Sequence, residues 1–529
     1  MRKHLKQVIK KAAVLVCLCL SVIACGADVA DRPPANGAEA PVPPADKSTL
    51  YNTPIPAEIM TPDRVESRIG TLTYFDGMPD VDTVQKVYNN LDFMRGVDVF
   101  LNFIPATSIE ALRRGMAEAG AKASHQVVVM DDLMNANQLF LTGNTDTVYA
   151  SAFLDLQRDG ATVVEVPPGA GPGTVNDAFF RFVVDMGSPG PDRGKGGKYL
   201  ILPPGYDGDV PEGYFVAKSR TYVNWLILRG FLVDGKPDAA SRMWRTGLKV
   251  YPLSGADAPP AMEYINGSAL VFNTIHANDF KFYEELHAVI DREPADFIEP
   301  QLLGLATAIG IQKGKRFQPD ARMRGILEEA VAVGNATARA TWLKPRDQSA
   351  YFYDEKCWYT GFIGGDYQWL IDGGLGGRNM DARTLFFYSA TVNTPAMAAK
   401  MIGVGSQYAF CAVDRDGNYL DGNRNYKLHI PANVPAKDFW SVVVYDPQTR
   451  SELQTAQQFP SKNSLKSPLV YNEDGSVDLY YGPSAPAGLE NNWTETVPGK
   501  GWFILLRLYG PLEPWFDKSW QPGEFELLR

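Results

Sequence analysis

The chain has 529 residues, of which 45% are hydrophobic and 21% are charged, a globular composition with enough chain for two or three hydrophobic cores. It carries 51 basic against 61 acidic residues, a formal net charge of −10. This acidic excess argues against nucleic-acid binding, which needs a basic face to neutralise phosphates. The 48 glycines and 38 prolines predict many turns, and an aromatic content of 11% favours a large β component.

The first 24 residues are typical of an export signal and are set apart from the fold. Basic residues precede the apolar run AAVLVCLCLSVIA, which is too short to span a bilayer as a stable helix. The run ends in VIAC, which resembles the lipobox of bacterial lipoproteins, and this predicts that Cys25 is lipidated, for example with palmitate. A plain secretory signal with a chance cysteine is the alternative. Gly26, where an aspartate would favour the inner membrane, favours an outer-membrane anchor facing the periplasm.

Residues 25–58 are rich in proline and alanine and show no apolar period, so we predict a tether that holds the folded part away from the membrane. Without residues 1–24 the chain carries 46 basic and 61 acidic residues, a net charge near −15. Besides Cys25, this part of the chain contains only Cys357 and Cys411. These two can form a disulfide in an oxidising compartment or remain as buried free thiols, and their spacing favours neither.

Two helices are predicted after the tether. The segment VDTVQKVYNNLDFMRGVDVFL (81–101) has apolar residues at helical spacing. Thr107-Ser108-Ile109-Glu110 has the pattern of a capping box, which predicts the start of a second helix, and Gly120 is positioned to end it.

Short β-branched and aromatic runs recur from Gln126 to Leu232, separated by Gly/Pro-rich stretches too short for crossover helices. Residues 59–235 are therefore predicted to hold the helices and a first antiparallel domain, a β-sandwich or jelly roll. Residues 236–405 are predicted to form a helical connecting region, and residues 406–529 a second β-sandwich with a hairpin turn at Asp416-Gly417. The predicted fold class is mixed α and β, mainly antiparallel.

Several long segments resemble two known families. NTDTVYASAFLDL (144–156) resembles the signature of the domain-of-unknown-function family 1254. The stretch from about Gln407 to Leu528 resembles the partner family 1214, through YKLHIPANVPAKDFWSVVVYDPQTRS, NEDGSVDLYYGP, NNWTETVPGKGWFILLRLYGPLEPWFDKSW and PGEFEL. GIQKGKRFQPDARM, GNATARA and FFYSATVNTPAM match the long form of these two-domain proteins. The resemblance implies a β-sandwich or jelly roll at each end of a helical region, and it implies no biochemical role.

The stretch NTDTVY gathers the polar residues most suited to chemistry in the first β domain. We expect it in a hairpin turn that presents four candidate ligand-binding or catalytic side chains, with Arg181 and Asp185 on a nearby run; the four are Asn144, Asp146, Thr147 and Tyr149. A purely structural role is the alternative, since Asn and Asp side chains also cap their own turns.

In the second β domain, His429 is a candidate general base because the pKa of histidine lies near working pH, although a lone histidine on a sheet also serves to hydrogen-bond a neighbour. Trp440 is a candidate platform for a sugar ring or a core residue. The chain lacks a G-x-S-x-G elbow, an H-E-x-x-H motif and a complete set of metal ligands, so no metal site is predicted and no cofactor can be named.

Three functions remain open at this point. The first is an envelope lipoprotein that binds a small-molecule or carbohydrate ligand. The second is a periplasmic hydrolase or lyase with acid/base chemistry at Asp146, Tyr149 or His429. The third is a structural lipoprotein that assembles as a homo-oligomer. We favour the first, because no set of nucleophile, base and orienting residue can be named.

Overall fold

The computed structural model describes residues 53–354 and 356–528. Residues 63–528 belong to one compact unit, and residues 53–62, with a single 3-10 turn at Ala57–Ile59, belong to another. Residues 1–24, Cys25 and most of the predicted tether lie outside the described residues. Within the described part of the chain, no helix has the length and apolar character needed to cross a membrane.

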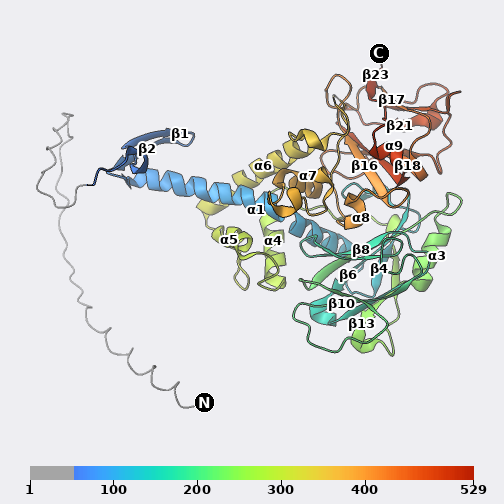
Figure 1. The fold of residues 1–529 in the computed structure, drawn as a ribbon, viewed down its shortest axis with the longest axis horizontal. Coiled ribbons are helices and arrows are strands. Elements are labelled where there is room, and N and C mark those ends of the chain that lie inside the picture. The colour runs from blue at the N-terminus through green and yellow to red at the C-terminus, as the bar shows by residue number, and fades with distance from the viewer. Residues whose placement is uncertain (1–52, 355, 529) are drawn as a thin grey trace, which may run out of the picture. The chain divides into compact units, whose positions relative to one another are not determined.

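The larger unit is a mixed α/β structure whose sheets are mostly antiparallel, as predicted (Figure 1). Its α-helices are α1 (Val81–Glu118), α2 (Leu156–Asp159), α3 (Asp238–Gly247), α4 (Lys281–Arg292), α5 (Pro300–Ala308), α6 (Ala321–Leu343), α7 (Met380–Ser389), α8 (Pro395–Ala398) and α9 (Glu513–Phe516). A small sheet formed by β1 (Arg64–Ser67), β2 (Gly70–Phe75) and β3 (Met78–Pro79) precedes α1.

The two helices predicted between residues 81 and 120 are in fact one helix, α1, of 38 residues. It begins at Asp80, whose side chain accepts a hydrogen bond from the Thr83 amide at 2.6 Å, and the left-handed Gly120 (φ 110°) follows its end as predicted. The capping-box prediction failed because Thr107 lies inside the helix, where its hydroxyl donates to the carbonyls of Phe103 and Ile104.

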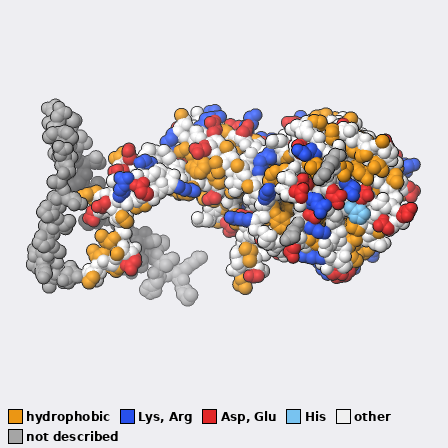
Figure 2. Space-filling view, turned by 90° about the horizontal axis from the view of Figure 1, so that it is seen from above, with side chains coloured by type: hydrophobic (Ala, Val, Ile, Leu, Met, Phe, Trp, Pro, Cys, Tyr) orange, Lys and Arg blue, Asp and Glu red, His pale blue; other side chains and the backbone are white. Residues whose placement is uncertain are grey.

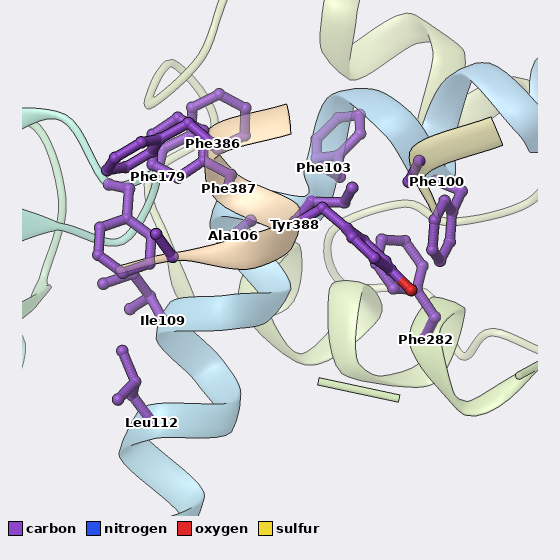
Figure 3. Close-up of a cluster of buried hydrophobic side chains, with 14 of the residues drawn as sticks. Phe100, Phe103, Ala106, Ile109, Leu112, Phe179, Phe282, Phe386, Phe387 and Tyr388 are labelled. Atoms are coloured by element: carbon purple, nitrogen blue, oxygen red, sulfur yellow. The ribbon is translucent and has the colours of Figure 1, made fainter. Parts of the chain in front are cut away.

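Tertiary packing holds α1 together across Pro105, which removes one backbone hydrogen bond from the helix interior. Glu110, the last residue of the predicted capping box, is buried and binds arginines of α1 and α4. Figure 3 shows the apolar face of α1 packed against aromatic side chains of α4 and α7, in a cluster that includes Phe100, Phe103, Ala106, Ile109, Leu112, Phe179, Phe282, Phe386, Phe387 and Tyr388. Burial of each large side chain stabilises the fold by roughly 1.5–3 kcal/mol, enough to override the local signals for a break.

The first β region consists of two sheets that share one apolar core. The six-stranded sheet has the order β14 (Glu263–Asn266), β4 (Gln126–Val129), β6 (Val148–Asp155), β12 (Val223–Gly230), β8 (Gly173–Asp177) and β9 (Phe182–Met186). The four-stranded sheet has the order β11 (Phe215–Lys218), β10 (Gly197–Leu202), β7 (Thr162–Val166) and β13 (Lys249–Pro252). A two-stranded pair joins β5 (Gln138–Leu139) to β15 (Phe272–Asn273).

The second β region also consists of two sheets around a common core. One has the order β16 (Ser406–Cys411), β22 (Phe503–Pro511), β18 (Ala436–Tyr445) and β19 (Ser461–Asn463). The other has the order β21 (Trp493–Glu495), β20 (Val477–Gly482), β17 (Tyr426–Ile430) and β23 (Phe525–Leu527).

The region predicted as a helical connector also contains strands that complete the first β region. β13 pairs with β7, and β14 pairs with β4. The interval 249–273 therefore belongs to the sheets rather than to the connector.

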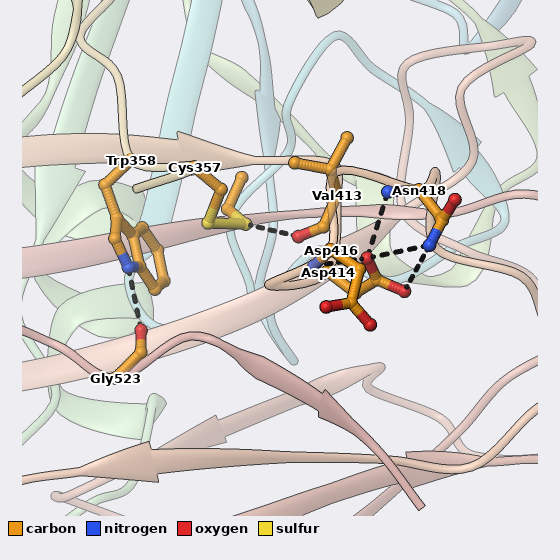
Figure 4. The surroundings of a disulfide bond; sticks show 8 residues. Cys357, Trp358, Val413, Asp414, Asp416, Asn418 and Gly523 are labelled. Carbon is orange, nitrogen blue, oxygen red and sulfur yellow. Dashed lines mark hydrogen bonds between the residues drawn. A yellow bond between two sulfur atoms is a disulfide. The ribbon is translucent and has the colours of Figure 1, made fainter. Parts of the chain in front are cut away.

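A disulfide joins Cys357, from the connecting region, to Cys411 on β16, with the Cα atoms 5.1 Å apart (Figure 4). Nearby, the Trp358 indole donates to the Gly523 carbonyl at 2.8 Å. Asp414 accepts the Asn418 amide at 2.9 Å in the predicted Asp416-Gly417 turn, which is present. The sequence left the pairing of these cysteines open, and the structure resolves it as a bond that ties the connecting region to the second β region.

Candidate ligand-binding site between the two β regions

The NTDTVY stretch is a buried bend and not the predicted hairpin turn. A hairpin requires the strands on either side to pair with each other, but β5 pairs with β15, and β6 pairs with β4 and β12. Residues 144–147 are at most 3% exposed. The polar side chains of the bend therefore find their hydrogen-bond partners inside the protein, except for Asp146 Oδ2, which has none among the described residues.

Most of these partners belong to the second β region. The Thr145 hydroxyl lies 2.9 Å from that of Ser461, and the Asn463 amide donates to Asp146 Oδ1 at 2.7 Å. Lys466 Nζ lies 3.6 Å from the same carboxylate oxygen and donates to the Thr145 carbonyl. The bend is thus an internal interface that holds the two β regions together.

Asn144 joins tyrosines from the two regions. Its Nδ2 donates to the hydroxyl of Tyr509 on β22 at 2.8 Å and to that of Tyr149 on β6 at 3.1 Å. Thr147 is completely buried beside them, 3.4 Å from the same amide nitrogen. Side chains along β6 alternate as predicted, since Val148, Ala150 and Ala152 face the core between the two sheets, whereas Tyr149 and Phe153 face the opposite way.

Tyr149 lines two adjoining cavities. Both cavities are lined by six shared residues from the first β region, the connecting segment and the second β region: Tyr149, Ile227, Arg229, Val392, Met397 and Tyr408. The walls are mainly apolar, which is typical of pockets that hold small organic molecules. We refer to the two cavities together as the inter-region cavity.

Two arginines place positive charge at this cavity. The Arg229 guanidinium lies 5.5 Å from the centre of the Tyr149 ring and 5.9 Å from that of Tyr509. Its Nη1 is 3.4 Å from the Ser406 hydroxyl, and its Nε has no hydrogen-bond partner in the described chain. Arg507 donates to the Tyr445 hydroxyl at 2.7 Å and to the Thr142 carbonyl at 2.8 Å. Within the described residues, neither guanidinium forms an ion pair with a carboxylate.

The arginines make Tyr149 the more acidic of the two tyrosines. Burial alone raises the pKa of Tyr149, but the charges of Arg229 and Arg507, with hydrogen bonds from Asn144 and Thr147, lower the net pKa from its ordinary value near 10. Burial and the charge of Asp146 raise the pKa of Tyr509 well above that value. A negative charge in this pair therefore belongs on Tyr149, at the cavity wall.

Asp185 lies at another wall of the same cavity. Burial raises its pKa to about 6, although hydrogen bonds from Thr394 and Thr174 act in the opposite direction. Its Oδ2 accepts from the Thr394 hydroxyl at 2.9 Å, and its Oδ1 has no partner among the described residues. The cavity therefore combines a cation, a phenol of lowered pKa and a carboxyl whose pKa is raised to about 6.

The other candidates lie elsewhere. Arg181 pairs with Asp177 at 2.6 Å and lines a different cavity. His429 on β17 lies 2.7 Å from Asp478 on β20, within one sheet of the second β region. Trp440 is 5% exposed and belongs to the core of that region, where it offers no platform to a sugar. No group of three or more His, Cys, Asp or Glu side chains that could hold a metal occurs within residues 53–354 and 356–528.

Sequence reasoning missed the two arginines, although a signal was present. NWLILRGFL and WFILLRLYG are apolar strands that each contain one arginine, Arg229 and Arg507. A charged residue in an otherwise apolar strand is rarely buried without a purpose.

Comparison with known proteins supports the division into two β regions. Residues 124–252 match the model of DUF1254, a family of proteins of unknown function, and residues 405–513 match that of DUF1214, a second such family. The two matches cover separate segments of the chain, one in each β region. The inter-region cavity lies between them, since Tyr149 and Arg229 belong to the DUF1254 region, whereas Tyr408 and Arg507 belong to the DUF1214 region.

Two solved structures resemble the chain at low sequence identity. The VPA0106 protein from Vibrio parahaemolyticus is 16% identical with a TM-score of 0.50, over 83% of this chain and 100% of that one. A putative uncharacterized protein from Burkholderia cenocepacia is 13% identical with a TM-score of 0.38, over 84% of this chain and 96% of that one. The first likeness concerns the fold alone. No curated protein matches the chain significantly.

Proposed function

We propose that the protein binds a small organic acid in the inter-region cavity, with the carboxylate of the ligand at Arg229. The observation that carries this proposal is a guanidinium at the wall of an apolar cavity, with no carboxylate partner in the described chain and an Nε without an acceptor. The tyrosines around Arg229 raise its pKa, but they supply no carboxylate, and an anionic ligand would provide the acceptor that the buried Nε lacks.

The walls suggest the rest of the ligand. Apolar side chains from two parts of the chain line both halves of the cavity and suit a short aliphatic or aromatic body: Ile227 on β12, and Val392 and Met397 in the connecting segment. Trp440, the candidate platform for a sugar ring, is only 5% exposed. A compact organic acid therefore suits the site better than a sugar chain.

Thermal unfolding of the full chain in detergent, with and without hexanoate or benzoate, tests this proposal. Each carboxylate should raise Tm, and the matched neutral amides, hexanamide and benzamide, should not. Arg229→Met should weaken carboxylate binding roughly 10- to 100-fold, the equivalent of a charge-assisted hydrogen bond worth about 1.5–3 kcal/mol. Arg242→Met, at an exposed arginine of α3, is the matched control. Equal stabilisation by acids and amides, or full binding by Arg229→Met, would refute the proposal.

A second candidate function is acid/base catalysis at Tyr149, in a lyase or hydrolase. The observation that favours it is the lowered pKa of this tyrosine beside two arginines, an arrangement suited to removing a proton next to a bound carboxylate. If hexanoate stabilises the protein, NMR in D2O should then show exchange of its α-protons, and Tyr149→Phe should abolish this exchange while preserving binding. If no ligand that binds shows exchange, catalysis is refuted and ligand binding remains as the proposed function.

We further propose that the protein is an envelope lipoprotein attached through Cys25. The lipobox-like segment before this cysteine and the Pro/Ala-rich segment after it support the proposal. Metabolic labelling with palmitate should mark the protein, and Cys25→Ala should remove the label and release the chain from the membrane fraction. Equal labelling of Cys25→Ala would contradict the proposal.

We also infer that each β region is a two-layer sandwich. In support, strands of the six-stranded and four-stranded sheets contribute to one core in the DUF1254 region, and both four-stranded sheets contribute to one core in the DUF1214 region. An experimental structure that placed the two sheets of either region against separate cores would disprove this inference.

A further inference from the structure

A separate cavity gathers four arginines from distant parts of the chain. We call it the arginine cavity. Arg181 comes from the turn before β9, Arg220 precedes β12, and α7 and the segment before it supply Arg383 and Arg378. It shares no lining residue with the inter-region cavity.

Arg383 is the deepest of these cations, with 6% of its surface exposed. It donates to the Asn102 carbonyl at 3.0 Å, and its guanidinium lies 5.3 Å from the Phe179 ring and 5.9 Å from that of Phe387. Figure 3 shows these two rings at the same end of the buried aromatic cluster. Burial, with the nearby charge of Arg378, lowers the pKa of Arg383 to about 9. The site is thus unfavourable for a cation in the absence of an anion.

Little acidic charge compensates the cluster. Arg181 is paired through Nε with Asp177, but its buried Nη2 has no hydrogen-bond partner in the described chain. Glu299 is the one acidic residue among those that line the cavity, and it is exposed. Charges of both signs are intermixed on the face seen in Figure 2, and the whole chain is acidic. The excess of positive charge in the arginine cavity therefore contrasts with the mixed surface charge and the net acidic charge of the chain.

We propose that the arginine cavity binds a small anion that carries at least two negative charges. Four guanidinium groups outnumber the three nearby carboxylates, those of Asp177, Glu299 and Asp366, and leave a net positive charge. Guanidinium groups suit phosphate and carboxylate oxygens because their N–H donors form parallel hydrogen bonds. Arg383 forms the floor, and Arg220 and Arg378, which are exposed, stand at the mouth. This site is independent of the organic acid proposed for the inter-region cavity.

Inorganic pyrophosphate tests the proposal by calorimetric titration and thermal unfolding of the full chain, with sodium chloride at matched ionic strength as reference. Pyrophosphate should bind and raise Tm beyond the chloride reference. Arg378→Gln, at the exposed mouth, should weaken binding at least tenfold without loss of folding. Arg383→Met should raise the Tm of the ligand-free protein, because it removes an unpaired buried charge, and should abolish the response to pyrophosphate.

Two control variants distinguish pyrophosphate binding in the arginine cavity from binding to surface arginines or to the inter-region cavity. Arg242→Gln removes an exposed arginine outside the cavity and should bind pyrophosphate normally. Arg229→Met, which removes the proposed carboxylate site, should also bind pyrophosphate normally. The proposal is overturned if pyrophosphate acts no better than chloride, if Arg378→Gln binds with unchanged affinity, or if Arg229→Met removes the response.

Discussion

Exchange of one amide for a carboxylate at the interface between the β regions provides the sharpest test of the bend at residues 144–147. In Asn463→Asp, the oxygen that replaces Nδ2 faces Asp146 Oδ1 at the present distance of 2.7 Å. The remaining oxygen still accepts the amides of Leu465 and Lys466, so the local turn is preserved. The substitution therefore changes one contact: an amide that donates to the Asp146 carboxylate is replaced by a second carboxylate.

The expected loss of stability follows from the burial of this pair. Both residues are 1% exposed, so two adjacent negative charges cannot both persist. Keeping one aspartic acid protonated at pH 7, against an ordinary pKa of about 3.9, costs about 4 kcal/mol at about 1.4 kcal/mol per unit. The proton held between the two carboxyl groups forms a hydrogen bond that offsets part of this cost. The free energy of unfolding should therefore fall by about 3 kcal/mol. The loss should shrink as the pH falls towards 4, where protonation is nearly free.

Urea unfolding at pH 7 and pH 5 measures this effect. The double variant Asp146→Asn with Asn463→Asp exchanges the two groups, restores one amide–carboxylate bond and should recover all but about 1 kcal/mol. Asn423→Asp is the matched control, since Asn423 also donates to a carboxylate, that of Asp421, at 2.7 Å, but at an exposed site. It should lose less than about 1 kcal/mol. A loss below about 1 kcal/mol for Asn463→Asp at pH 7, or no recovery in the double variant, would refute the proposed contact.

Two further predictions concern the same part of the molecule. Burial raises the pKa of Glu452, which is 1% exposed, to about 8, so the folded protein should lose stability as the pH rises from about 5 to 8. In urea unfolding, Glu452→Gln should make this decline less steep. An equally steep decline in the variant would contradict the assignment. The disulfide between Cys357 and Cys411 spans 54 residues. In the double alanine variant, loss of its constraint on the unfolded chain should lower the free energy of unfolding by about 4 kcal/mol, and dithiothreitol should not lower the stability of this variant further. A variant whose stability depends on reductant, or one with an unchanged unfolding midpoint, would count against the bond.

Local pattern predicted most of the strands. The run VYASAFLDL alternates apolar and polar positions as β6 does, and YVNWLILRG corresponds to β12, because one face of each strand is buried in the core between sheets. The sequence Gly173-Thr-Val-Asn-Asp of β8 was missed because it has one large apolar residue, although all five residues are buried. Its polar side chains are satisfied inside the protein, which composition cannot reveal.

The helix prediction failed for a related reason. The capping-box pattern at Thr107 is a local signal, and it competes with packing against α4, α6 and α7, whose residues lie 170 or more positions along the chain. The packing partners decide the outcome, and they are invisible to a window of a few residues.

The candidate site shows the same limit most clearly. The composition of NTDTVY indicated a special role, and the alternation along β6 placed Tyr149 on one face. The partners that define that role, Ser461, Asn463 and Tyr509, follow more than 300 residues later. No local rule connects these segments, and only the pairing of β5 with β15 excludes the predicted hairpin.

The interface at Asp146 joins segments that are synthesised at different times. Asp146 leaves the ribosome 317 residues before Asn463, its hydrogen-bond partner. At roughly 5–20 residues per second, the interval is on the order of 16–63 seconds. Throughout that time the nascent DUF1254 region holds a polar bend whose partners do not yet exist. The bend therefore cannot complete its hydrogen bonds until the segment that contains Asn463 has been made.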